Sequence, residues 1–201
     1  MLTFPDGILP TECAWQLVSR SKQFKNPYTN GGGQTLALPG VYWTATLTFG
    51  VLTRAQAALM AGFIAEMNGM AGSMQIWDHA FAIPQGNAGG TPVVDGNGQS
   101  GITLNIRGCT PSVTWLKTGD YFQLGNQLHI MTADAATDVT GRCTLRFRAP
   151  MRQQPADGTA LITIKPKAIM RLKDDNQGMR RSTKKLVISS FSLELEEDIT
   201  A

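Results

Sequence analysis

The glycine-rich stretch that begins at Gly96 is the first place where this sequence could carry chemistry. Gly96, Gly98 and Gly101 have the G-x-G-x-x-G spacing that lets backbone amides approach a pyrophosphate at the start of a helix. The residues that follow, Ile102 to Ile106, instead alternate as a strand does, and a linker precedes the motif. Ser100 does not complete a G-x-S-x-G nucleophile elbow, because position 102 is isoleucine. We therefore expect neither a nucleotide site nor a serine nucleophile here.

Acid, base and metal chemistry also lack a suitable group of residues. Asp78 and His79 are adjacent, and neighbouring residues of a strand point to opposite faces, so a partly buried histidine is favoured over a catalytic dyad. His129 lies in an apolar stretch with no second ligand at metal-binding spacing, which favours a structural role. The three cysteines are widely spaced, namely Cys13, Cys109 and Cys143. They predict no metal or disulfide framework, and we expect no catalytic residue, cofactor or metal.

Four arginines lie at spacings that place several of them on one strand face: Arg142, Arg146, Arg148 and Arg152. Such a row can bind phosphate or an acidic sugar. Aromatic residues are scarce between these arginines, which disfavours nucleic acid. A subunit contact or a solvated face is the preferred interpretation.

The charge of the chain is mild in total but uneven in distribution. The net charge is +3 over 201 residues, which gives little support to specific nucleic-acid binding or membrane insertion. Residues 165–185 hold eight basic and two acidic residues, whereas residues 194–198 hold four acids and no base. This asymmetry fits either two solvated segments or matched surfaces in an oligomer. Without a basic and apolar leader at the start, we expect synthesis and folding in a reducing cytoplasm.

One helix is predicted, within Leu52 to Trp77, and it is the helical element available to position the residues named above. Thr53 and Gln56 form a capping box, and Asn68 with Gly69 supplies the stop. The predicted apolar face consists of Ala55, Leu59, Phe63 and Met67, widened by Met60 and Ile64. The opposite face is small, with Ala57, Ala61 and Ala65. It is either the alanine-rich back of a single helix or a candidate subunit interface.

The rest of the chain has the alternating pattern of β-strands, so the predicted fold class is mainly β (α+β). Val41 to Phe49 alternates most clearly, after a strand over Gln34 to Leu38 and a turn at Pro39 and Gly40. Leu186 to Leu195 also alternates, and we expect it to return to the sheet of Val41 to Phe49. The further predicted strands are Cys13 to Ser21, Ser73 to Trp77, Ile102 to Arg107, Tyr121 to Leu124, Gln127 to Thr132, Cys143 to Phe147 and Thr159 to Ile164. A linker after Pro84 sets the domains as 1–84 with 172–201, and an inserted small β-barrel or sandwich over 85–171.

The order of these motifs resembles that of tail proteins of tailed bacteriophages. The residues that carry the resemblance include Asn26-Pro27-Tyr28-Thr29, Leu38-Pro39-Gly40, Trp43-Thr44-Ala45-Thr46-Leu47, Leu52-Thr53-Arg54-Ala55-Gln56-Ala57, Gly90-Thr91-Pro92-Val93-Val94, Leu116-Lys117-Thr118-Gly119-Asp120-Tyr121-Phe122, Pro155-Ala156-Asp157-Gly158 and Pro166-Lys167-Ala168. The resemblance spans nearly the whole chain and rests on the order of the motifs. Within that group, the strand, strand, helix, strand core with a late return strand is similar to distal tail proteins.

The resemblance implies a tail-tube-like antiparallel β-sandwich with one packed helix, which assembles as a hexameric ring at the tail tip. It implies a virion location in the tail, with the tail tube protein, the tail hub and other tip proteins as partners, and no enzymatic activity. The basic residues Arg180, Arg181, Lys184 and Lys185 are further candidates for the subunit interface. The alternative is that the inserted β-domain serves as a module that binds a host receptor or sugar.

Overall fold

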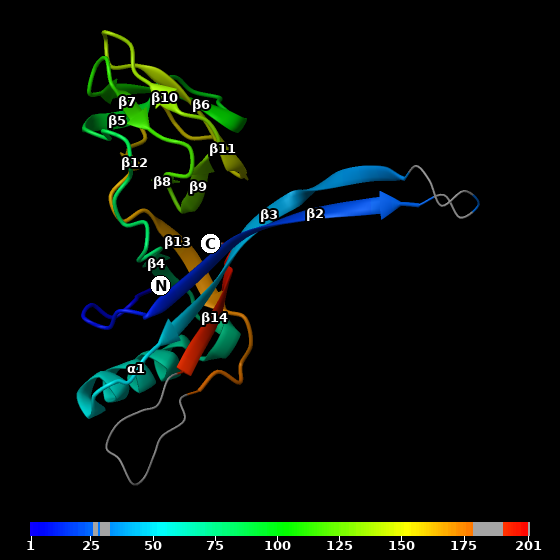
Figure 1. The fold of residues 1–201 in the computed structure, drawn as a ribbon, viewed down its shortest axis with the longest axis vertical. Helices are drawn as coiled ribbons and strands as arrows, with labels where there is room; N and C mark the ends of the chain where they lie inside the picture. The colour runs from blue at the N-terminus through cyan, green and yellow to red at the C-terminus, as the bar shows by residue number, and fades with distance from the viewer. Residues whose placement is uncertain (26–27, 29–32, 179–190, 201) are drawn as a thin grey trace.

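The chain folds into a sheet with one helix, a separate barrel and a long projecting hairpin (Figure 1). The computed structural model describes residues 1–25, 28, 33–178 and 191–200. These contain fourteen strands, one α-helix and one short 3-10 helix, η1 (Gly69–Ala71). The predicted mainly β fold is confirmed.

The core sheet has six strands in the order β1-β4-β13-β14-β3-β2. Their bounds are β1 (Leu2–Thr3), β4 (Met74–Trp77), β13 (Lys167–Leu172), β14 (Phe191–Glu197), β3 (Gln34–Phe49) and β2 (Glu12–Phe24). All neighbours are antiparallel except β1 and β4. Phe191 of β14 lies opposite Phe49 of β3, so the predicted return of the last strand is confirmed for its described residues.

The second sheet curls into a nearly closed barrel in the order β12-β8-β9-β11-β6-β5. Its strands are β12 (Leu161–Ile162), β8 (Tyr121–Leu124), β9 (Gln127–Met131), β11 (Cys143–Met151), β6 (Gly101–Cys109) and β5 (Gly90–Val94). A bridge between Val93 and Ala160 connects the two ends of this order. The pair β7 (Thr114–Leu116) and β10 (Ala135–Ala136) completes the unit. Its apolar core includes Trp115, Phe122 and Phe147, all fully buried.

Helix α1 (Arg54–Met67) covers the core sheet. Both bonds of the predicted capping box form: the Gln56 amide donates to the Thr53 hydroxyl, and the Thr53 amide donates to Gln56 Oε1. Asn68 ends the helix in the left-handed conformation with φ of 51°. The buried residues are Ala57, Met60, Phe63 and Met67. Phe63 packs edge-on to Phe4, with 5.6 Å between the ring centroids.

The expected apolar face of the helix is wrong at two of its six positions, while Ile64 is partly buried against the core. Phe63, Met67 and Met60 are buried as expected, but Leu59 is 53% exposed and Ala55 is exposed. Ala57, which we expected on the small outer face, is 5% exposed and belongs to the core. The buried positions 57, 60, 63 and 67 follow one another at steps of three or four, which places them on the one side of the helix that faces the sheet.

Strand β3 runs without interruption through the expected turn at Pro39 and Gly40. The pairing with β2 shifts there, because three residues of β3 between Leu38 and Tyr42 oppose Ser19 alone. Gly40 has φ of +120°, which only glycine adopts readily, so the turn signal marks a bulge in place of a chain reversal. Beyond this bulge the two strands leave the sheet and project to the right in Figure 1.

The barrel and the sheet meet at Trp43, although the barrel is inserted in the chain. Trp43 Nε1 donates to the Leu128 carbonyl oxygen at 2.9 Å, and the Trp43 ring lies 5.6 Å from that of Tyr121. Tyr121 and Leu128 belong to the same apolar cluster as the core sheet. The expected boundary at residue 171 falls inside β13, whose residues pair with β4 and β14 of the core sheet.

Candidate functional site

The distal part of the β2–β3 hairpin projects away from the rest of the molecule (Figure 1). We call residues 20–24 and 34–38 the arm. Paired residues of an antiparallel ladder share a face, so the register places Arg20, Lys22 and Phe24 on one face with Gln34, Leu36 and Leu38. The other face carries Ser21, Gln23, Thr35 and Ala37. The arm therefore has one apolar and cationic face and one small, neutral face.

The apolar side chains of the arm lie in solvent. Phe24, Leu36 and Leu38 are 50%, 51% and 39% exposed. Lys22 Nζ lies over the Phe24 ring at 5.2 Å from its centroid. The sequence has three basic and no acidic residues from Leu17 to Gly40. The arm is thus suited to an apolar surface without a strong positive charge.

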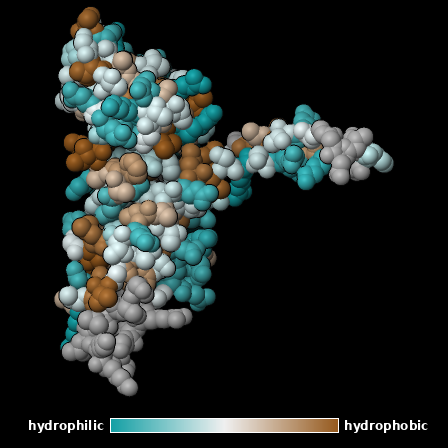
Figure 2. Space-filling view, viewed as in Figure 1, coloured by the Kyte–Doolittle hydropathy of each residue, from teal (hydrophilic) through white to brown (hydrophobic). Residues whose placement is uncertain are grey.

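A second apolar surface lies where the chain passes between the core sheet and the barrel. The outgoing and returning segments run side by side, since the Lys165 amide donates to the Ala82 carbonyl oxygen at 2.7 Å. Around this bond lie four exposed large residues, which we call the connector patch: Phe81, Ile83, Ile162 and Ile164. Ile83 is 73% exposed and Ile164 is 63% exposed. The connecting segments lie on the left margin of the molecule, where Figure 2 shows hydrophobic atoms gathered.

The residues that the sequence marked as a subunit interface are placed in three different ways. Ala57 is buried in the core, Ala61 is half-buried and Ala65 is exposed. The exposed side of α1 that includes Ala65 also carries Ala58, Leu59 and Gly62. Arg180, Arg181, Lys184 and Lys185 lie outside the described residues.

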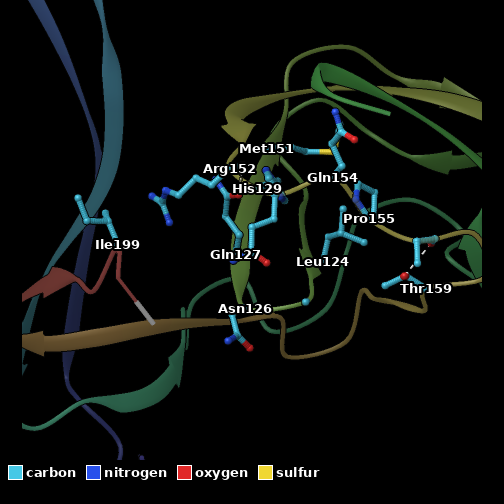
Figure 3. Close-up of a pocket in the computed structure, with 13 residues that line it drawn as sticks. Leu124, Asn126, Gln127, His129, Met151, Arg152, Gln154, Pro155, Thr159 and Ile199 are labelled. Atoms are coloured by element: carbon cyan, nitrogen blue, oxygen red, sulfur yellow. Dashed lines mark hydrogen bonds between the residues drawn. The ribbon is translucent and has the colours of Figure 1, made fainter. Parts of the chain in front are cut away.

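A pocket of about 390 Å³ opens between the barrel and the end of the chain (Figure 3). It is lined by Leu124, Gly125, Asn126, Gln127, His129, Met151, Arg152, Gln153, Gln154, Pro155, Ala156, Thr159 and Ile199. The β8–β9 hairpin and the segment after β11 supply most of these residues. Arg152 extends from the barrel toward the segment that holds Ile199.

The charge of Arg152 is neutralised at the edge of this pocket. Its two terminal nitrogens donate to Glu197 Oε1 and Oε2, each at 2.8 Å. Glu197 is 2% exposed and also accepts the Trp43 amide at 2.9 Å. This bidentate, charge-assisted ion pair between Arg152 and Glu197 joins the barrel to β14 of the core sheet.

His129, which the sequence marked as structural, forms the buried part of the pocket lining. Its Nδ1 lies 2.7 Å from the Ala149 carbonyl oxygen, and a carbonyl can only accept, so Nδ1 carries the proton. Burial lowers the pKa of His129 to about 4, which keeps the ring neutral at pH 7. Nε2 is therefore a bare acceptor, and it has no partner among the described residues.

The adjacent pair Asp78 and His79 forms no dyad. The Asp78 carboxylate accepts the Ala80 amide at 2.9 Å, while the His79 ring lies against Trp77 at a centroid distance of 4.9 Å. Burial raises the pKa of the nearby Cys13 thiol and the pKa of the Asp78 carboxyl. Cys13 is therefore a neutral thiol, which is a poor nucleophile.

The glycine motif and two of the four arginines take part in local structure. The Gly96 amide donates to Asp157 Oδ1 at 2.8 Å, and Gly101 begins β6 where a nucleotide fold would begin a helix. Arg142 pairs with Asp95, and Arg152 pairs with Glu197, whereas Arg146 and Arg148 are exposed on the barrel. No group of three or more His, Cys, Asp or Glu side chains in the described ranges is arranged to hold a metal ion.

Sequence reasoning missed the arm, the connector patch and the pocket. The arm had a signal, because the predicted strand over Gln34 to Leu38 lies directly before that of Val41 to Phe49, with only Pro39 and Gly40 between them. The pocket had none, since residues from three separated segments line it.

No protein-family model matches this chain, and no curated protein matches it. Among the described helices, none combines the length and the apolar character needed to cross a bilayer.

Proposed function

We propose that this protein is a structural subunit of a bacteriophage tail, which assembles with further copies into a hexameric ring at the tail tip between the tail tube and the tip proteins. The observation that carries the proposal is the arm, whose large apolar side chains Phe24, Leu36 and Leu38 stay about half exposed in the described chain. The role is structural and not enzymatic. The motif order described above supports the assignment to a phage tail.

The arm needs a partner for physical reasons. A two-stranded hairpin alone in water is at best marginally stable, because it lacks a second layer to cover its apolar face. Three large side chains lie half in water along this face, namely Phe24, Leu36 and Leu38. Fully burying a side chain of this size from full exposure is worth about 1.5–3 kcal/mol, and these side chains start half-exposed, so docking of the arm would recover roughly half of that for each and stabilise the assembly.

The positions of the two apolar surfaces favour a ring. The arm projects from one side of the molecule, and the connector patch lies on the opposite margin (Figures 1 and 2). A contact between two different patches on opposite sides is heterologous, and repeated heterologous contacts close into a ring when the rotation per subunit permits it. We propose that the arm of one copy docks on the connector patch of the next.

The test is the oligomeric state of arm variants. Leu36→Glu places a charge on the apolar face, whereas Thr35→Glu places the same charge on the other face of the same strand. We expect analytical ultracentrifugation to show oligomers for the wild type and for Thr35→Glu, and monomers for Leu36→Glu. Ile164→Glu, on the connector patch, should behave like Leu36→Glu.

Two outcomes contradict the proposal. If Leu36→Glu assembles as the wild type does, the arm is not the contact. If the wild type is monomeric at high concentration and mass spectrometry does not find it in virions, the structural role itself is lost.

A further inference from the structure

Two of the three cysteines lie next to each other in the barrel, although they are far apart in the sequence. Cys109 ends β6 and Cys143 begins β11, and these two strands are antiparallel neighbours (Figure 1). Both side chains pack in the apolar cluster of the barrel, where Cys109 is 5% exposed and Cys143 is partly buried. Both are free thiols. The fold therefore brings together a pair of thiols that the wide spacing in the sequence did not predict.

A β-bulge turns the two side chains to the same face of the sheet. Cys143 lies directly opposite Ile106, so these two residues share the inward face. The Cys109 amide donates to the Gly141 carbonyl oxygen at 3.0 Å, so two residues of β6 stand opposite Arg142 alone. The second of them, Gly108, has φ of +82°, which glycine adopts readily. This extra residue returns Cys109 to the inward face, where a regular strand would point it outward.

The two thiols differ in reactivity. The Cys109 thiol donates a hydrogen bond to the Cys143 sulfur, which lowers the pKa of Cys143 and raises the pKa of Cys109. Burial raises the pKa of Cys109 further. Cys143 is also the more exposed of the two. Because the thiolate is the nucleophile, Cys143 is suited to attack a reagent from solvent, and Cys109 is suited to act as the second, resolving thiol.

We propose that Cys143 and Cys109 form a reversible disulfide by exchange with a small-molecule disulfide such as oxidised glutathione. The Cys143 thiolate attacks one sulfur of the reagent, whose S–S bond breaks and releases one thiolate. The Cys109 sulfur then attacks the Cys143 sulfur of this mixed disulfide and displaces the second thiolate. The two cysteines lose two electrons and two protons in total, which convert the reagent into two thiols. The new bond joins β6 to β11 at the bulge, and its formation does not depend on ring assembly.

The experiment maps the disulfides of the full, folded chain. The reduced protein is incubated in glutathione buffers of increasing oxidised fraction, quenched with acid, alkylated and analysed by peptide mass spectrometry without reduction. We expect a linked pair of peptides that contain Cys109 and Cys143, with Cys13 alkylated. Cys13 lies in the core sheet, and its raised pKa makes it a poor nucleophile. Excess dithiothreitol should restore both thiols.

Serine variants separate the two roles. Cys109→Ser removes the resolving thiol, so we expect the reaction to stop with one glutathione attached to Cys143. Cys143→Ser removes the attacking thiolate, so Cys109 should react about tenfold more slowly than Cys143 does in the wild type. Cys13→Ser is the matched control and should form the same link as the wild type. The map of the wild type needs no variant, so it tests the proposal even where a variant fails to fold.

Three results overturn the proposal. The first is a wild-type map with no Cys109–Cys143 link even in oxidised glutathione alone. The second is glutathione that stays on Cys143 of the wild type, which would show that Cys109 does not reach it. The third is a link that joins either cysteine to Cys13 or to a second chain instead. The map reads covalent chemistry and not assembly, so each of these results leaves the ring proposal intact.

Discussion

At the scale of single residues, the neutral His129 makes stability depend on pH. Burial lowers its pKa from an ordinary value of 6.5 to about 4 in the folded chain. Between these values the unfolded chain binds a proton that the folded chain does not, so unfolding becomes easier as the pH falls. The contribution is complete above pH 6.5 and is lost as the pH falls toward 4.

We expect this histidine alone to reduce the free energy of unfolding by about 3 kcal/mol between pH 7 and pH 4. Urea unfolding of the wild type and of His129→Phe at several pH values measures the effect. The variant keeps an aromatic ring between Phe122 and Phe147 but cannot titrate. If both proteins lose stability equally over this range, His129 is not the group responsible.

Residue-scale prediction from sequence worked where the chemistry is local. The capping box of Thr53 and Gln56 and the stop at Asn68 involve neighbours within a few positions, and each forms as expected. The acceptor at His129 Nε2 was out of reach, because its isolation depends on Ala149, Phe122 and Phe147 from other positions of the barrel. An apolar stretch that contains a histidine indicates burial but not an unmade bond.

At the scale of elements, the orientation of α1 places Ala57 in the core and Ala65 at the surface, so the same substitution should affect stability differently at the two positions. Ala57→Arg buries a charge without a partner in the core, so we expect it to reduce the free energy of unfolding by about 3 kcal/mol or more. Ala65→Arg adds the same side chain to the exposed side of α1 and should change stability by less than about 0.5 kcal/mol. Urea unfolding of both variants checks the contrast.

The same pair tests the helix as an interface. If the exposed side of α1 contacts a neighbouring copy, Ala65→Arg blocks assembly while the isolated chain stays folded. Ultracentrifugation that shows normal assembly of Ala65→Arg would restrict the contact to the arm and the connector patch.

Strand prediction succeeded for Val41 to Phe49, where one face is buried, and missed β13, where consecutive residues are buried. Val41 to Phe49 alternates, and Trp43, Ala45, Leu47 and Phe49 all face the core as expected. In β13, by contrast, Ala168, Ile169 and Met170 are consecutive and all buried. Without alternation, nothing in the sequence assigned β13 to the core sheet, which is why the expected boundary fell inside it.

At the scale of the whole molecule, Glu197 connects the inserted barrel to the core sheet. Its carboxylate is almost fully buried, forms an ion pair with Arg152 and accepts a hydrogen bond from the Trp43 backbone amide. Glu197→Ala leaves a buried amide and a guanidinium without their partner, so we expect a loss of about 3 kcal/mol in the free energy of unfolding.

Glu196→Ala is the matched control, since Glu196 pairs with Arg171 on the adjacent position of the same strand but at the surface. We expect it to cost less than about 1 kcal/mol. Guanidinium unfolding of both variants gives the comparison, and equal losses would show that the Glu197 pair does not hold the two units together.

The two connecting segments have a consequence for engineering. Because the Lys165 amide donates to the Ala82 carbonyl oxygen, the segments by which the chain enters and leaves the barrel lie next to each other. A foreign domain whose own ends lie close together could replace the barrel between these two segments, provided that the graft ends before Lys167, where β13 begins. Such a graft would also have to supply a new cover for Trp43, whose indole the barrel now shields.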